Sequence, residues 1–122
     1  MPSKSKTKGN RFERQIVDRA KHFDLKAKRA WGSDGRAMGQ HEEVDVVIGD
    51  NLRVHAKCRK KIAQWMIPNE NVDIQVVKGD REIPLAVMPL DFFLILYKLS
   101  FNLKNEFLKS ISLKLIFLIS II

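Results

Sequence analysis

The chain has 122 residues, 45% of them hydrophobic, so it is long enough to form one domain with a buried core. Its 22 lysines and arginines against 14 acidic residues give a formal net charge of +8, which favours polyanionic partners, nucleic acid first. Cys58 is the only cysteine, which excludes an intrachain disulfide and a cysteine-rich zinc module and fits a reducing, intracellular setting. No signal peptide is evident, and the C-terminal apolar run LIFLISII is shorter than the roughly 20 residues of a membrane span, so we expect no membrane partner.

The first elements expected along the chain are a basic arm and a helix. Residues 1–8 are polar and rich in lysine, which predicts a flexible arm. From Gly9 to Phe23 the pattern indicates an amphipathic helix capped by Gly9 or Asn10. Its apolar residues recur every three or four positions: Phe12, Ile16, Ala20 and Phe23. Glu13 borders this apolar stripe, so it can point along the surface that the helix covers.

A strand and a glycine-rich loop are expected next. Residues Leu25–Trp31 alternate, and Arg29 falls in the apolar register, where it either reaches the rim or serves a site. The segment GSDGRAMGQHEE has three glycines and no apolar periodicity, which predicts a flexible loop. Ser33, Arg36 and the glycine amides of this loop are candidates to meet phosphate.

The stretch from Val44 to Arg59, VDVVIGDNLRVHAKCR, predicts a β-hairpin. Apolar residues alternate with polar ones on both sides of a turn at Gly49, Asp50 and Asn51. If the apolar set faces the core, three polar residues project together from the opposite face: Asp45, His55 and Lys57. Cys58 falls in the apolar set, and we expect it to be a small core residue.

Four further elements complete the expected fold. They are a short helix over Arg59–Met66 ended by Pro68, strands over Val72–Val77 and Ile83–Met88, and a helix over Leu90–Leu99. The order predicts an α/β protein with a mixed sheet formed by residues 9–98. Residues 99–122 differ in composition, and we expect an amphipathic helical tail that packs on the domain, binds a partner or membrane, or has no function. Trp31 and Trp65 are expected in core or dimer packing, with base stacking as the alternative.

The polar residues of the first helix and the hairpin suit phosphodiester hydrolysis. Glu13 and Asp45 offer the hard oxygen ligands that Mg²⁺ or Mn²⁺ prefers, and such an ion activates water and polarises the phosphoryl oxygen. Lys57 is suited to hold the attacking water and to offset the charge that grows on phosphorus. A zinc cluster of His41, His55 and Cys58 is a weaker alternative, because a fourth ligand is missing.

These motifs resemble the PD-(D/E)XK nuclease superfamily, and within it the archaeal and phage Holliday-junction resolvases. The resemblance covers about Gly9 to Tyr97. It is carried by the segments GNRFERQIVD, GSDG, VDVVI, HAKCRKK and DIQVVKGDREIPLAVMPLDFF, and by Arg29. It implies a restriction-endonuclease-like mixed β-sheet core flanked by helices, and a cytoplasmic setting in a bacterial, archaeal or phage-infected cell. It also implies a homodimer that makes paired Mg²⁺-dependent incisions in branched double-stranded DNA without a small-molecule cofactor.

The resemblance assigns roles by position. The metal ligands would be Glu13, Asp45 and His55, with Lys57 as the catalytic lysine and Ser33 near the scissile strand. By position, Arg14 and Arg29 would contact DNA phosphate. Independently of the resemblance, we expect contacts to the DNA backbone from Arg36 of the glycine-rich loop and from the positive surface of Arg59, Lys60 and Lys61. His55 departs from the family pattern, which has an acidic residue there, and imidazole shifts the metal preference towards Mn²⁺. Glu42 or Glu43 offers compensation. The alternatives are a branched-DNA-binding protein that has lost cleavage and a repair or restriction-like nuclease of linear DNA.

Overall fold

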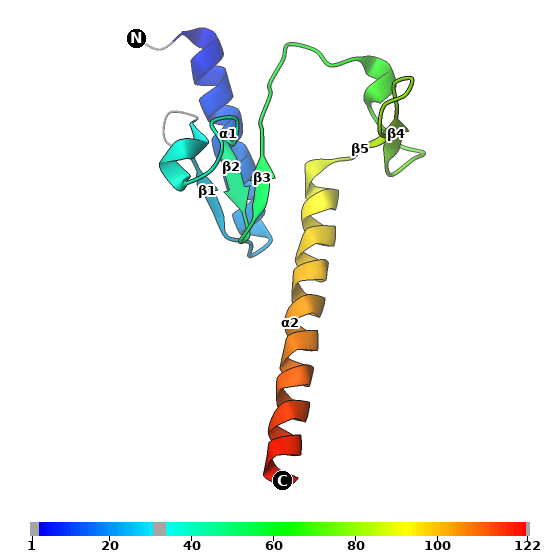
Figure 1. Cartoon of the computed structure of the whole chain (residues 1–122). Helices are drawn as coiled ribbons and strands as arrows, with labels where there is room; N and C mark the ends of the chain where they lie inside the picture. The colour runs from blue at the N-terminus through cyan, green and yellow to red at the C-terminus, as the bar shows by residue number, and fades with distance from the viewer. Residues whose placement is uncertain (1–2, 31–33, 122) are drawn as a thin grey trace.

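The computed structural model describes residues 3–30 and 34–121, with the backbone alone described at 116, 117 and 119–121. In this part of the chain the elements are, in order, α1 (Lys4–His22), β1 (Ala27–Arg29), η2 (Gly35–Met38), β2 (Val46–Ile48), β3 (Leu52–Val54), η3 (Gln64–Met66), β4 (Gln75–Val77), β5 (Leu85–Val87) and α2 (Leu90–Ile121). The chain is thus an α/β protein with two helices and small antiparallel sheets (Figure 1).

Helix α1 confirms the helix expected over Gly9–Phe23, but it begins earlier. Ser3 is the N-cap, and its side chain accepts a hydrogen bond from the backbone N–H of Lys6 at 3.2 Å. A capping serine followed by lysines, which are good helix formers, carries the helix back through the expected arm. Gly9 and Asn10 therefore lie within the helix, and the capping role predicted for them is wrong.

The hairpin expected between Val44 and Arg59 is confirmed as the pair β2–β3, but β3 ends at Val54, so the second strand is shorter than predicted and His55 and Lys57 lie beyond it. The strands are antiparallel, with Val47 opposite Arg53, and β1 joins the other side of β2 to complete a three-stranded sheet. The turn needs a glycine at Gly49, where φ is +63°. A side chain there would also collide with Tyr97 of α2, because a Cβ atom would lie 2.6 Å from the tyrosine hydroxyl oxygen.

The core lies between α1, the three-stranded sheet and the start of α2. Its buried residues are Ile16, Ala20, Leu25, Val46, Ile48 and Leu94. Leu90, Phe93 and Tyr97 pack against this cluster from α2. Two polar contacts hold the same end of α2: Arg19 of α1 pairs with Asp91 at 2.7 Å, and Lys98 Nζ donates to the carbonyl oxygen of Asp24 at 3.1 Å.

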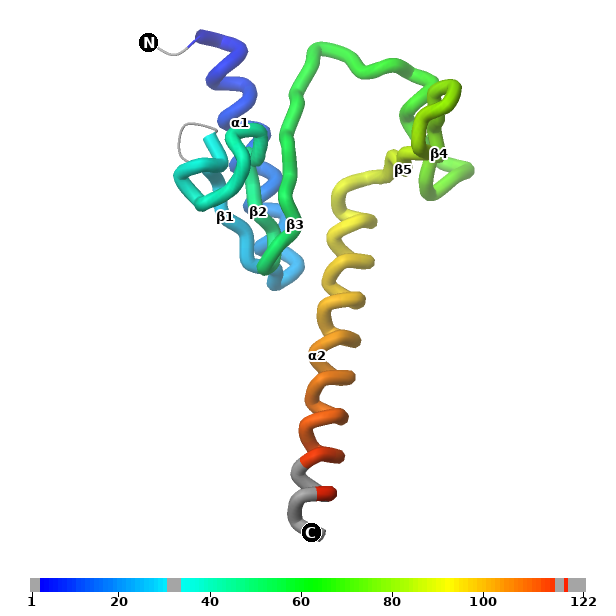
Figure 2. Tube along the Cα trace, in the orientation of Figure 1, coloured from blue at the N-terminus to red at the C-terminus, as the bar shows by residue number. Residues whose placement is uncertain are grey.

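The helix expected over Arg59–Met66 is wrong. Residues 55–63 form no helix or strand but run as an extended segment away from the sheet, and only the short η3 follows (Figure 2). Ile62 and Trp65 are 58% and 67% exposed, so the apolar face on which that helix depended has nothing to bury against. Adjacent positive charges at Arg59, Lys60 and Lys61 disfavour a short helix further.

The single mixed sheet is also not what the structure shows. Strands β4 and β5 pair only with each other, as an antiparallel hairpin separate from β1–β2–β3 (Figure 1). Val76, Ile83 and Leu85 of this hairpin region are 60%, 77% and 57% exposed. The strand positions agree with the expectation, but alternation within a strand does not specify which sheet the strand joins.

Helix α2 continues without a break through the expected boundary at residue 99. The tail is therefore helical, as predicted, and it extends well beyond the folded part of the chain (Figure 2). Apolar side chains along the tail are exposed, Leu103 and Leu113 by 66% and 68%. Within the described residues, neither helix combines the length and the apolar content that crossing a membrane requires.

Candidate functional site

The predicted catalytic residues of α1 and the hairpin line one open pocket, here called the acidic pocket. Its lining comprises Glu13, Asp34, Glu42, Glu43, Asp45, His55, Ala56 and Lys57. Both carboxylates predicted as metal ligands are buried, Glu13 with 4% and Asp45 with 6% of its surface exposed. His55 and Lys57 are exposed. The structure therefore brings together four residues that lie up to 44 positions apart in the sequence.

Asp45 is held by the backbone at the point where β2 begins. Its N–H donates to Val54 at 2.9 Å, and its carbonyl oxygen accepts from Ala30 at 2.8 Å. Its side-chain oxygen Oδ2 accepts a hydrogen bond from the N–H of Ala56 at 2.7 Å. The start of η2 packs closely here, since a Cβ atom on Gly35 would lie 2.8 Å from the carbonyl oxygen of Val44. These contacts fix one carboxylate oxygen and bury a residue that strand alternation places away from the core.

Glu13 is held by Arg29 of β1. The Nε atom of Arg29 donates to Glu13 Oε2 at 3.1 Å, and its Nη2 atom donates to Asn10 Oδ1 at 3.4 Å. Asn10 and Glu13 are one helical turn apart, so a single guanidinium spans both. Arg29 was expected either at the rim or in a site, and its side chain is 25% exposed and bonded to a residue of the acidic pocket.

His55 and Lys57 follow β3 on the extended segment and keep the alternation expected of them. Residues 52–58 alternate between half-buried and exposed, with Arg53, His55 and Lys57 exposed. His55 Nε2 lies 4.0 Å from Asp45 Oδ2, which is too long for a hydrogen bond but close enough for attraction when the imidazole is protonated. His55 and Asp45 are thus neighbours, as the hairpin pattern indicates.

The donor chemistry of the acidic pocket suits a divalent cation. Glu13, Asp45, Glu42 and Glu43 offer carboxylate oxygens, and His55 offers a nitrogen that Mn²⁺ accepts more readily than Mg²⁺ does. In the part of the chain that the structure describes, no three His, Cys, Asp or Glu side chains are arranged as a metal-binding group. The predicted ligands Glu13, Asp45 and His55 line the same pocket, but they are not arranged around a common metal position, and Glu13 is hydrogen-bonded to Arg29.

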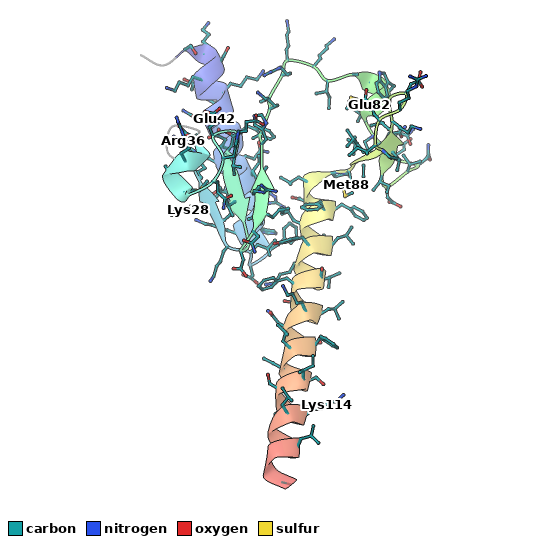
Figure 3. The ribbon with its side chains drawn as sticks, viewed as in Figure 1. Lys28, Arg36, Glu42, Glu82, Met88 and Lys114 are labelled. Atoms are coloured by element: carbon teal, nitrogen blue, oxygen red, sulfur yellow. The ribbon has the colours of Figure 1, made fainter. Side chains whose placement is uncertain are left out.

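A second pocket, here called the basic pocket, lies between α1, β1 and η2. It is lined by Lys6, Asn10, Arg14, Lys28, Arg29, Ala30, Ala37 and Met38. Arg14 and Arg29 are predicted to bind DNA, and the pocket also contains Lys6, Asn10 and Lys28, for which the sequence predicts no role. Lys6, Asn10 and Arg14 follow each other at four-residue spacing, so they share one face of a helix. This spacing is informative only because α1 begins at Lys4, whereas the composition of residues 1–8 predicts a flexible arm. Figure 3 labels Lys28 on β1, and nearby it labels Arg36 on η2 and Glu42 in the segment between η2 and β2, neither of which lines this pocket.

The other predicted DNA-binding residues lie elsewhere. Arg36 is paired with Asp34, with Nη2 and Oδ2 2.6 Å apart. Hydrogen bonds from the side chain and then the backbone N–H of Arg36 lower the pKa of Asp34. The side-chain hydrogen bond to Asp34, followed by the charge of Asp34, raises the pKa of Arg36. Arg59, Lys60 and Lys61 are exposed on the extended segment. Cys58 is half-buried and is not part of the core cluster, so its predicted core position is wrong. Ser33 and Trp31 lie outside the described residues.

Comparison of the chain with protein-family models, with curated proteins and with solved structures finds no match. The two pockets and the net charge are therefore the features of this chain that bear on its function.

Proposed function

We propose that the chain is a metal-dependent endonuclease acting on DNA, with branched, four-way junctions as its preferred substrate and a homodimer as its working form. The observation that carries the proposal is the pair of buried carboxylates, Glu13 and Asp45, which share an open pocket with Lys57. Buried acidic side chains are unusual unless they are paired or serve a site. A formal net charge of +8 supports a polyanionic substrate. The proposal includes a restriction-endonuclease-like core built on α1 and the sheet β1–β2–β3, without the single mixed sheet expected from the sequence.

The acidic pocket suggests a division of labour in phosphodiester hydrolysis. Glu13 and Asp45 would hold Mg²⁺ or Mn²⁺, with His55 or a neighbouring glutamate as a further ligand. When bound, such an ion supplies Lewis-acid polarisation of the phosphoryl oxygen and lowers the pKa of a coordinated water. Lys57, at the exposed side of the pocket, would offset negative charge on the scissile phosphate. The backbone N–H of Ala56 orients Asp45.

The basic pocket supplies a surface for the DNA backbone on the same part of the molecule. Arg29 lines the basic pocket while it is hydrogen-bonded to Glu13 of the acidic pocket, so the two pockets adjoin. Cationic side chains around a helix and a strand would bind phosphates without reading sequence. This arrangement would suit a nuclease that recognises the DNA backbone and its shape rather than its sequence.

A non-cleaving DNA-binding protein is the second candidate, and one observation favours it. The hydrogen bond from Arg29 occupies an oxygen of Glu13 that a metal ion would need. In addition, His55 stands at the position where the family that this chain resembles has an acidic residue. Under this alternative the basic surface binds branched DNA while the acidic pocket performs no chemistry.

Incubation of the protein with a labelled four-way junction and a linear duplex of matching sequence, each with Mg²⁺ or Mn²⁺, tests the proposal. We expect cleavage of the junction, with Mn²⁺ at least as effective as Mg²⁺. Asp45→Asn should abolish cleavage, whereas Asp50→Asn, an exposed aspartate in the turn of the same hairpin, should retain it. Binding without cleavage in either metal would establish the second candidate. Equal cutting of linear DNA would refute junction preference, and full activity of Asp45→Asn would show the site to be wrong.

A further inference from the structure

Helix α2 carries an apolar stripe that continues far beyond the folded part of the chain. Its members are spaced alternately by four and three residues, which is the heptad period of helices that pair along a seam. They are Leu90, Leu94, Tyr97, Phe101, Lys104, Leu108, Ile111, Leu115 and Leu118. Lys104 is the one polar member.

The two ends of this stripe have different surroundings. Leu90, Leu94 and Tyr97 belong to or pack against the core, and Leu94 is fully buried. Leu108, Leu115 and Leu118 are 51%, 54% and 57% exposed, although they continue the same line of side chains. The stripe is therefore a core-forming surface that the chain itself covers only at its N-terminal end. Figure 2 shows the remainder of the helix standing free of the sheet.

The exposed area is large enough for a second copy of the chain to cover. A compact protein of 14.1 kDa exposes about 6,700 Å², whereas this chain exposes 10244 Å². This excess of about 3,500 Å² belongs to the whole chain, including the extended segment 55–63 and the β4–β5 hairpin as well as the free part of α2, and a standard stable interface needs only roughly 800 Å² from each partner. Residues 101–118 form 18 residues of helix, about 27 Å long, which corresponds to about two and a half heptads of a coiled coil.

We infer that residues 101–118 of α2 pair with the same segment of a second copy, in antiparallel orientation. In that orientation each stripe residue faces a different stripe residue of the second copy: Phe101 faces Leu118, Lys104 faces Leu115, and Leu108 faces Ile111. All three pairings use one register, so the stripe is complementary to itself. A parallel pair would instead place two Lys104 ammonium groups side by side in the seam, which is unfavourable.

An anionic membrane is a less suitable occupant of this face. A helix that lies on a membrane collects its lysines on one polar side. Lys104, Lys109 and Lys114 are five residues apart, so successive lysines are rotated by about 140° around the helix and point in different directions. Figure 3 shows Lys114 on the free part of the helix.

The molar mass in solution tests the pairing. Light scattering after size exclusion should give twice 14.1 kDa for the native chain and 14.1 kDa for the double variant Leu108→Glu, Ile111→Glu. Leu103→Glu is the matched control, because Leu103 is 66% exposed but lies outside the stripe, and it should stay dimeric. Circular dichroism of each variant checks that the fold persists. A monomeric native chain, or a stripe variant that remains dimeric, would overturn the inference. So would a monomer that binds anionic vesicles and loses that binding in the stripe variant.

Disulfide cross-linking tests the orientation. Two proteins are made in the Cys58→Ser background, one with Lys104→Cys and one with Leu115→Cys. We expect a covalent dimer when the two are mixed under oxidising conditions, at several times the yield of either protein alone. Cross-linking of each protein with itself and none between the two would show a parallel pair and overturn the antiparallel seam.

Discussion

Arg29 is the residue at which the two pockets meet. It lines the basic pocket, and its guanidinium is hydrogen-bonded to the buried Glu13 of the acidic pocket. Because a buried carboxylate is expensive without a cationic or hydrogen-bonding partner, the pair contributes to stability as well as to the site. Sequence alternation placed Arg29 in an apolar register and left its role open. The hydrogen bond to the buried Glu13 explains why an arginine occupies a position that faces α1, where an apolar residue would be expected.

Arg29→Gln should therefore destabilise the fold by about 1–3 kcal/mol, because Glu13 loses a charged donor while staying buried. The double variant with Glu13→Gln should recover part of this loss, since the buried charge is then removed as well. Urea unfolding of the native chain, both single variants and the double variant measures the coupling. Equal stability of Arg29→Gln and the native chain would show that the hydrogen bond contributes nothing.

Asp91 provides a test of pH dependence. Hydrogen bonds from the side chain of Arg19 are the main cause of the lowered pKa of Asp91. Partial desolvation opposes this shift, and the charges of Arg19 and His22 add to it. Since the folded-state pKa is below the unfolded value of about 3.9, the stabilisation is fully present above that value and is lost as the pH falls through the folded-state pKa.

Asp91→Asn should lower the melting temperature at pH 7 and have a diminishing effect as the pH falls below about 4. Asp34→Asn is the control. Hydrogen bonds also lower the pKa of Asp34, but its partner Arg36 is two residues away, so the pair persists more easily in the unfolded chain. A pH-independent difference for Asp91→Asn would contradict the role of the ion pair with Arg19.

At the scale of elements, local patterns predicted what could be decided locally. The alternation of Val44–Arg59 and the turn at Gly49 specify an antiparallel hairpin within one short stretch, and the structure contains it. The spacing of Ile16 and Ala20 likewise specifies the buried face of α1. Glu13 and Asp45 were found as a candidate pair because both positions follow from these two local patterns.

The predictions that failed depended on distant partners. Ile62 and Trp65 have helical spacing, but a short helix forms only when its apolar face is covered, and no element of the described chain covers it. Strands β4 and β5 were located, but their sheet was not, since pairing between distant strands is not encoded in the alternation of either one. The basic pocket was only partly found, because its helix begins at Lys4.

The two hairpins should therefore respond differently to the same substitution. Val46 of β2 is fully buried, and Val46→Ala should cost about 1–3 kcal/mol through lost contacts and a cavity. Val76 of β4 is 60% exposed, and Val76→Ala should change stability by less than about 0.5 kcal/mol. Chemical denaturation compares them. A cost at Val76 as large as that at Val46 would mean that β4–β5 packs into the main core, as a single mixed sheet requires.

For the whole molecule, net charge and local clusters of charge make different predictions for DNA binding. The formal charge of +8 is a property of the entire chain, whereas contacts with phosphate need particular side chains. Lys60 and Lys61 lie on the exposed extended segment that follows Lys57 of the acidic pocket. Lys109 and Lys114 lie on the free part of α2, outside its apolar stripe, and their removal changes the net charge by the same amount.

Lys60→Gln with Lys61→Gln should weaken binding to a short labelled duplex and reduce the slope of log affinity against log salt by about 1–2, because each phosphate contact contributes about 0.9. Lys109→Gln with Lys114→Gln should leave the slope almost unchanged. Fluorescence anisotropy over a range of salt concentrations measures both. If the slope of log affinity against log salt fell by the same amount in both double variants, attraction by net charge alone would account for binding. The extended segment would then have no specific place in the interface. If only the first pair mattered, DNA would lie along the segment that leads out of the acidic pocket, as cleavage there requires.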